Sequence, residues 1–287
     1  RYCPSIEDKI VKFPDKQSHQ IFLEPESLST NEIYCNGIPT SLPGDVQDFI
    51  VRHMPGCEDA KILRYGYAVE YDMVWPYQID ATTMTKTVRG LFLAGQINGT
   101  SGYEEAAGQG LLAGLNAARL LGGHDMIRLG RDQAYIGVMM DDLVTKIPRE
   151  PYRMFSSRAE HRLMLRADNA AQRLTPLAEQ WGLIDAPRRA IFKQRMQAID
   201  ALRDYLKHHR TAEGQRLEQW ARTPNVDTDA MLDKLNGDPL PELARDRRTI
   251  APLLSDMQYE GFIRRHQQQW QRVLDQEHRI IPGRFDY

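Results

Sequence analysis

One run of sequence, between Gly90 and Gly123, constrains the fold of this chain more than any other. It reads GLFLAGQINGTSGYEEAAGQGLLAGLNAARLLGG and joins a short apolar segment to a glycine-rich loop and then to a stretch of small residues. The all-apolar residues Leu91 to Ala94 are typical of a strand buried on both faces of a parallel sheet. We therefore expect a strand, a loop and a helix in succession.

The helix is expected to begin near Tyr103. Glu104 and Glu105 then fall in its first turn, where carboxylates complement the positive end of the helix dipole. Small residues leave the helix surface nearly bare, namely Ala106, Ala107, Gly108, Gly110, Ala113, Gly114, Ala117 and Ala118. Such a surface allows another group to approach closely.

The loop before this helix contains Gly95, Gly99 and Gly102. Glycines free the backbone to bring N–H groups up to a ligand, and a helix N-terminus favours an anionic group there. The pattern fits either a ligand-binding loop or a tightly packed connection without a ligand.

The segment GQINGTSGYEEAAGQGLLAGLNAAR closely resembles the last strand, loop and helix of the FAD domain in the MnmG (GidA) family, whose members modify the wobble uridine of tRNA. In that family the helix points its N-terminus at the flavin ring, and the glutamine of the AGQ triplet contacts FAD. That glutamine falls on Gln96. The resemblance implies an FAD site formed by Gly95, Gln96, Asn98, Gly99, Gly102 and Tyr103.

Two further segments carry the same resemblance. EPYRMFSSRAEHRLMLRADNAAQRLT, from Glu150 to Thr175, resembles the other family signature, although the family usually has tyrosine where this chain has His161. RYCPSIEDKIVKF at the start resembles the segment that supplies NADH-site residues and a cysteine required for the reaction, here Cys3. The NADH residues implied are Arg1, Tyr2, Cys3, Pro4, Ser5, Ile6, Glu7, Asp8 and Lys9.

The residues around Cys3 agree with a functional thiol. Arg1 and Lys9 are nearby cations that favour the thiolate, and Pro4 favours an extended or turn conformation. Both covalent and proton-transfer roles remain open. Cys35 and Cys57 are interpreted as ordinary reduced thiols, because three cysteines without paired spacing predict neither a disulfide framework nor a metal site.

The resemblance implies an FAD-dependent enzyme that uses NADH as reductant and methylene-tetrahydrofolate as carbon donor. With a GTPase partner of the MnmE type, it would add an aminomethyl or carboxymethylaminomethyl group to uridine position 5. The full-length enzyme would be a homodimer. A folate- and FAD-dependent tRNA methyltransferase shares a similar glycine motif but lacks the PYRMFSSRAEHRLMLR segment. A non-catalytic RNA-binding and assembly module is the other alternative for the chain by itself.

We expect a mixed α/β and α fold, in which part of an FAD/NAD-binding α/β region is followed by a mainly helical domain. The expected divisions are residues 1–80 on the NADH side, 81–123 closing the FAD domain, and 124–287 binding tRNA and the partner. No G-x-G-x-x-G motif follows a predicted strand. We therefore expect an internal piece, truncated at its C-terminus, that is inactive and does not retain FAD by itself.

Several local elements are also predicted. Strands are expected at Gln20 to Leu23 and at Ile62 to Tyr71, the latter with a bulge at Gly66, and turns at Asn36-Gly37 and Pro43-Gly44. Helices are expected from Val46 to Met54, after the N-cap Asp185, and from Glu260 to Glu277, with a polar, broken stretch from Thr211 to Asn236. Asp141 and Asp142 fit chemistry or the orientation of a helix, and His208, His209 and His266 are interpreted as solvated side chains.

Arginines gather in the Glu150–Thr175 segment, the second signature, and directly before it, at Arg149, Arg153, Arg158, Arg162, Arg166 and Arg173. If residues 157–167 are helical, Arg158, Arg162 and Arg166 share one face, while Phe155, Ala159 and Leu163 turn toward the core. Such a face fits either an RNA phosphate backbone or a solvated surface with internal ion pairs. We expect Arg153, Arg158, Arg162 and Arg166 to bind tRNA.

Net charge and the distribution of apolar residues limit the classes of protein that this chain can represent. The formal net charge of -2 does not indicate a nucleic-acid binder, so any RNA contact must come from local patches. No long apolar stretch or secretory signal occurs in the sequence, which predicts a cytoplasmic protein without a membrane span.

Overall fold

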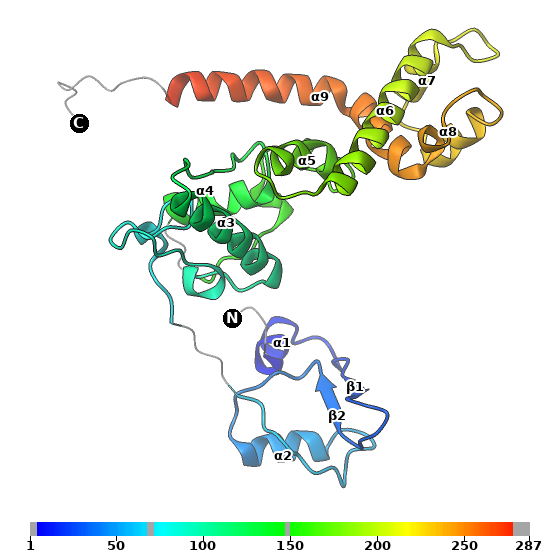
Figure 1. The fold of residues 1–287 in the computed structure, drawn as a ribbon. Coiled ribbons are helices and arrows are strands. Elements are labelled where there is room, and N and C mark those ends of the chain that lie inside the picture. Colours follow the sequence, from blue (N-terminus) through cyan, green and yellow to red (C-terminus); the bar gives the residue numbers. More distant parts are fainter. Residues whose placement is uncertain (1–4, 68–71, 147–149, 278–287) are drawn as a thin grey trace. The chain divides into compact units, whose positions relative to one another are not determined.

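The computed structural model describes residues 5–67, 72–146 and 150–277 (Figure 1). These residues form two compact units. The first comprises the described residues up to Ile127 together with those of Asp142–Met154, and the second comprises Arg128–Asp141 and the described residues from Phe155 onward. Helices make up most of the regular structure, and the described sheet has two strands. The expected mixed α/β and helical class is confirmed.

The first unit contains helices α1 (Ile6–Lys12), α2 (Gly44–Arg52) and α3 (Tyr103–Leu121), the 3-10 turns η1 (Pro76–Gln78) and η2 (Gly95–Asn98), and strands β1 (Phe22–Pro25) and β2 (Ile33–Asn36). Helix α4 (Tyr135–Thr145) contributes residues to both units. The second unit contains η3 (Ser156–Arg158), α5 (Ala170–Gln180), α6 (Ala186–His208), α7 (Leu217–Ala221), α8 (Thr228–Lys234), η4 (Glu242–Arg245) and α9 (Arg247–Glu277).

The hairpin near the start confirms a strand close to its predicted position. β1 begins two residues later than expected and pairs antiparallel with β2, so that Phe22 lies opposite Asn36. The Pro43-Gly44 dipeptide begins α2 rather than forming an isolated turn, because Pro43 occupies the N-cap position. The predicted helix is therefore present but begins and ends two residues earlier.

The strand predicted from Ile62 to Tyr71 is wrong over residues 62–67, and the rest of it lies outside the described residues. The Gln47 side chain takes both backbone groups of Gly66, since Nε2 donates to its carbonyl (2.9 Å) and Oε1 accepts from its N–H (2.8 Å). A neighbouring strand would need those groups. A Cβ at residue 66 would lie 2.6 Å from the Thr40 carbonyl oxygen, so the glycine permits close packing rather than a bulge.

The strand predicted at Leu91 to Ala94 is also wrong. Phe92 forms only an isolated antiparallel bridge with Met84, and Leu91 is 44% exposed. The Leu93 N–H bonds to the Thr83 carbonyl, where a left-handed backbone (φ 72°) ends the pairing. A buried strand needs neighbours on both sides, and the described residues supply one short partner segment.

The second unit has its own core around α6. Asp185 caps this helix as predicted, because its Oδ1 accepts from the Arg188 N–H (2.9 Å). Ile199, Leu202 and Leu206 are buried on one face, whereas Ile191 is 63% exposed. Helices α7, α8 and α9 pack around this face (Figure 1).

The polar stretch from Thr211 to Asn236 contributes more to this core than predicted. It contains α7 and α8, and it buries Leu217, Ala221, Met231 and Leu235. The predicted final helix is confirmed as part of α9, which begins at Arg247, well before the expected Glu260. No helix among the described residues is both long and apolar enough to cross a membrane.

Candidate functional site

The loop before α3 is a tight 3-10 turn between two left-handed glycines. Gly95 has φ 83° and Gly99 has φ 79°, values that other residues adopt only with strain. A Cβ at residue 95 would also lie 3.3 Å from the Ala106 Cβ. Gln96 is exposed on this turn, while Asn98 is buried. The predicted loop residues thus form one compact feature with Gln96 at its surface.

A buried side chain of α3 holds this loop in place. Gln109 Oε1 accepts from the Gly95 N–H (3.1 Å) and from Asn98 Nδ2 (2.8 Å). Gln109 Nε2 donates to Thr100 Oγ1 (2.9 Å), which in turn donates to the Gly95 carbonyl (3.0 Å). Gln109 and Asn98 have 0% exposure. Buried hydrogen bonds to the Gln109 side chain therefore fix the conformation of the loop.

Helix α3 begins at Tyr103 as predicted, and no side-chain hydrogen bond caps its N-terminus. Tyr103 and Glu104 are exposed, whereas Glu105 is 5% exposed. A Cβ at Gly102 would lie 1.7 Å from Glu105 Oε2, so a larger residue there would displace the Glu105 carboxylate. The uncapped N–H groups and the positive helix end suit a polar or anionic group beside the loop.

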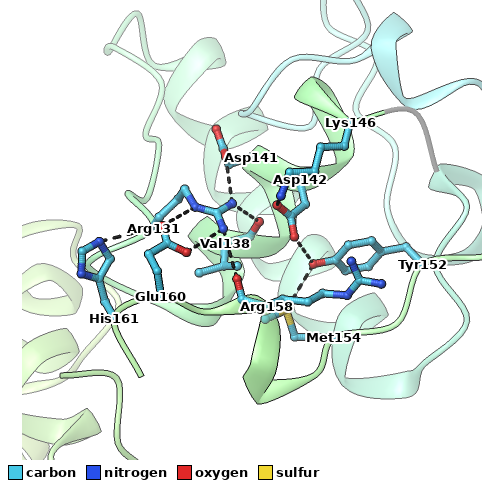
Figure 2. Close-up of polar contacts among 10 residues, drawn as sticks. All are labelled: Arg131, Val138, Asp141, Asp142, Lys146, Tyr152, Met154, Arg158, Glu160 and His161. Atoms are coloured by element: carbon cyan, nitrogen blue, oxygen red, sulfur yellow. Dashed lines mark hydrogen bonds and ion pairs between the residues drawn. The ribbon is translucent and has the colours of Figure 1, made fainter. Parts of the chain in front are cut away.

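Part of the second signature lies directly against this loop, within the first unit. The Tyr152 N–H donates to the Gly99 carbonyl (2.7 Å), and the Met154 N–H donates to Glu105 Oε1 (2.7 Å). The Tyr152 hydroxyl donates to buried Asp142 (2.9 Å), which also pairs with Lys146 (2.7 Å; Figure 2). Asp142 thus orients the segment that borders the loop.

A separate network, centred on Arg131, organises the second unit (Figure 2). Its guanidinium holds Glu160 through two hydrogen bonds (2.7 and 2.8 Å) and Asp141 through one (2.8 Å). It also donates to the Arg158 carbonyl (3.2 Å). The hydrogen bond from Arg131 is the main cause that lowers the pKa of Glu160. Asp141 therefore has a structural role in tying α4 to the second signature.

Residues 157–167 do not form the helix on which the shared arginine face depended. Only η3 and a series of turns occur there. In a helix, the carbonyls of Arg158 and Leu163 would accept from backbone N–H groups four residues later. Here Arg131 takes the first (3.2 Å) and Arg166 Nη1 takes the second (2.8 Å). Phe155 is 55% exposed rather than buried, whereas Ala159 is buried as predicted.

The predicted arginine stripe divides into different roles. Arg158 and Arg162 are exposed, and Arg153 is half-buried beside the loop-bordering segment. Arg166 instead pairs with Asp168 (2.9 Å) and Asp256 (2.5 Å) and is largely enclosed. The single helical face of arginines does not form.

The first residues of the chain are described only in part. Arg1, Tyr2, Cys3 and Pro4 lie outside the described residues. Ser5 begins α1 with a capping box to Asp8, and Lys9 Nζ donates to the Gly37 carbonyl (2.7 Å). Glu7 bonds to the Thr40 hydroxyl, and Ile6 donates its N–H to the Pro39 carbonyl (2.8 Å). Side chains of the predicted NADH segment from Ser5 to Lys9 thus help to anchor α1.

One of the three histidines interpreted as solvated, His266, is instead packed in a cluster with His161. His161 is 3% exposed, and its ring packs edge-on against His266 and Trp270, with ring centroids 4.8 and 4.7 Å apart. Burial lowers the pKa of His161. His266 is consequently part of a packed cluster rather than solvated, while His208 and His209 are exposed as predicted. No group of three metal-ligating side chains occurs in the described part of the chain.

Comparison with known proteins shows which proteins this chain resembles. Residues 1–125 match the family described as Glucose inhibited division protein A. The tRNA uridine 5-carboxymethylaminomethyl modification enzyme MnmG of Syntrophotalea carbinolica is 49% identical over 100% of this chain and 48% of that protein. The MnmG protein of Rhodopirellula baltica is 50% identical over 100% of this chain and 44% of its own length. The structure of Aquifex aeolicus GidA in its form II crystal has a TM-score of 0.83 at 44% identity, over 100% of this chain and 48% of that one.

The chain is therefore similar over its whole length to MnmG (GidA) proteins. It spans about half the length of the curated MnmG proteins it matches. Sequence reasoning identified the loop and left Asp142 between chemistry and the orientation of a helix, but it missed Gln109, whose side chain fixes the loop. The only available signal for Gln109 was its helical spacing from buried Leu112, Ala113 and Asn116.

Proposed function

We propose that this chain is the part of a tRNA wobble-uridine modification enzyme that holds the flavin ring of FAD. The observation that carries the proposal is the fixed Gly95–Thr100 loop at the uncapped end of α3. Gln96 is exposed on this loop, which leads into the backbone N–H groups at the start of α3, where the N-cap Gly102 makes no side-chain hydrogen bond. These groups fit the polar edge of a flavin, which needs hydrogen-bond donors and acceptors rather than a full charge.

The residues of the chain then have distinct tasks. Gln96, Gly95, Asn98, Gly99, Gly102 and Tyr103 form the flavin side of the site. FAD supplies hydride transfer when bound, while the protein supplies orientation and electrostatics. The family resemblance adds NADH as reductant, methylene-tetrahydrofolate as carbon donor, an MnmE-type GTPase as partner, and a homodimer in the cytoplasm. Residues 1–9 are proposed for NADH, and Arg153, Arg158 and Arg162 for tRNA.

Cys3 is proposed as the catalytic thiol. A matched control is available, because burial raises the pKa of the Cys35 thiol and keeps it protonated, and therefore a poor nucleophile. In the full-length protein, Cys3→Ser should reduce modification of the wobble uridine at least a hundredfold while FAD and tRNA still bind. Cys35→Ser should retain activity.

The test uses full-length protein with FAD, NADH, methylene-tetrahydrofolate, the GTPase partner and unmodified tRNA, followed by nucleoside analysis. An aminomethyl or carboxymethylaminomethyl group at uridine position 5 supports the proposal. A 5-methyluridine product would indicate the methyltransferase instead. Tight tRNA binding without FAD or any product would indicate an RNA-binding and assembly module. Wild-type turnover by the Cys3→Ser protein would remove Cys3 from the chemistry.

A further inference from the structure

We infer that Gln109 is a positioning residue for the flavin, acting through the loop that carries Gln96. This inference rests on the proposed FAD function. Gln109 lies in α3 and is fully buried. Its influence passes through the hydrogen bonds that its side-chain amide makes to Gly95, Asn98 and Thr100.

The loop needs such support because its own conformation is easily lost. Glycines at both ends have the largest backbone freedom in the unfolded and alternative states. The Gln109 amide restricts both ends at once, since it binds Gly95 at the start and Thr100 after the end of η2. Asn98 is held in the middle by Gln109 Oε1 and by the Leu93 carbonyl (2.9 Å). Gln96 is thereby presented from a defined backbone.

The chemistry of the amide is specific. Oε1 accepts from the Gly95 N–H and from Asn98 Nδ2, and Nε2 donates to Thr100 Oγ1, whose hydroxyl donates to the Gly95 carbonyl. A methionine of similar length would leave the Gly95 N–H and one Asn98 donor position without their buried acceptor. A carboxylate would keep the acceptor but lose the donor. A protonated carboxyl group would restore both, because one oxygen accepts while the other donates.

The experiment measures FAD affinity and the visible absorption and circular dichroism of the bound flavin in the full-length protein. Gln109→Met should weaken FAD affinity about tenfold or more and alter the flavin spectrum at every pH. Burial raises the pKa of a carboxyl group introduced at this position. Gln109→Glu should therefore bind FAD poorly at pH 8 and approach wild-type affinity and spectrum as the pH falls to 6. The wild-type protein at each pH is the reference.

Asn116→Leu is the matched control. Asn116 lies two turns further along the same buried face of α3 and bonds to Thr82 and Ile127 rather than to the loop. Its substitution should lower stability but leave the flavin spectrum unchanged. Wild-type affinity and spectrum in folded Gln109→Met, or in Gln109→Glu at pH 8, would overturn this inference alone. A wild-type protein that binds no FAD would overturn the proposed function as well. If Gln109→Met does not fold, the pH response of Gln109→Glu decides.

Discussion

Tyr152 makes one contact through its backbone and another through its side chain. Its backbone borders the η2 loop, and its hydroxyl donates to Asp142, which is 2% exposed. Tyr152→Phe removes this buried hydrogen bond and leaves Asp142 with its Lys146 pair. We expect the free energy of unfolding to fall by about 1–3 kcal/mol, measured by urea denaturation. Tyr103→Phe, at a side chain that is 93% exposed, is the control and should change stability little. Equal stabilities of the two variants would show that the Asp142 contact contributes nothing.

His161 makes the second unit sensitive to pH. Burial lowers the pKa of His161 below its usual 6.5, and nearby Glu160, His266, Asp132 and Arg131 modify that effect. The folded state therefore binds fewer protons than the unfolded state once the pH falls below about 6.5. Stability should decrease as the pH is lowered through this range, by about 1.4 kcal/mol for each unit of pKa lowering.

His161→Phe should reduce this pH dependence, measured as the urea midpoint at pH 7.5 and pH 5.5. His208→Gln, at an exposed position in the same unit, should keep the wild-type dependence. If His161→Phe loses as much stability on acidification as the wild type, another group is responsible for the effect.

Helix α6 shows how a local signal can be tested at the level of an element. The Asp185 carboxylate accepts from the Arg188 N–H, one of the helix donors that have no partner within the helix. Asp185→Ala should lower the free energy of unfolding by about 1 kcal/mol, measured by urea denaturation. Asp204→Ala, near the other end of α6 and paired with exposed Lys207 (3.6 Å), should cost much less. Equal losses of stability in the two variants would show that the Asp185 cap contributes no more than an exposed ion pair.

The elements that sequence predicted correctly depend on neighbouring residues. The start of α3 at Tyr103 and the cap of α6 at Asp185 follow from residues within one turn. The wrong elements were decided by distant side chains. The Gln47 side chain bonds to the backbone groups of Gly66 that a strand partner would need. Arg131 donates to the Arg158 carbonyl, which would accept a backbone hydrogen bond in a helix. No spacing pattern in the sequence reports such contacts.

For the candidate site as well, sequence predicted the local features and missed the contacts between residues that are distant in the chain. Its loop glycines and Gln96 were identifiable because backbone freedom and a following helix leave a local pattern. Gln109 was not identified, because its role depends on a fourteen-residue separation from Gly95 that only the folded loop brings together. Arg166 was assigned to RNA because its partner Asp256 is ninety residues away.

At the scale of the whole molecule, charge does not favour RNA binding. The formal net charge is -2, so attraction to tRNA must arise from a few local arginines. Among those proposed, Arg158 and Arg162 are exposed, whereas Arg166 is largely enclosed and pairs with Asp168 and Asp256. Salt dependence of tRNA affinity therefore distinguishes binding arginines from structural ones.

Replacing Arg158 and Arg162 together by Ala in the full-length protein should weaken tRNA binding and reduce its salt dependence. Each phosphate contact releases condensed counterions, so each lost contact should lower the slope of log affinity against log salt by about 0.7 to 0.9. Arg203→Ala, exposed on α6 outside the signature, is the control and should leave affinity and slope unchanged. Arg166→Ala should instead lower stability, because it leaves Asp168 and Asp256 without their shared cation. An unchanged slope in a folded Arg158→Ala, Arg162→Ala protein would assign these arginines to the solvated surface.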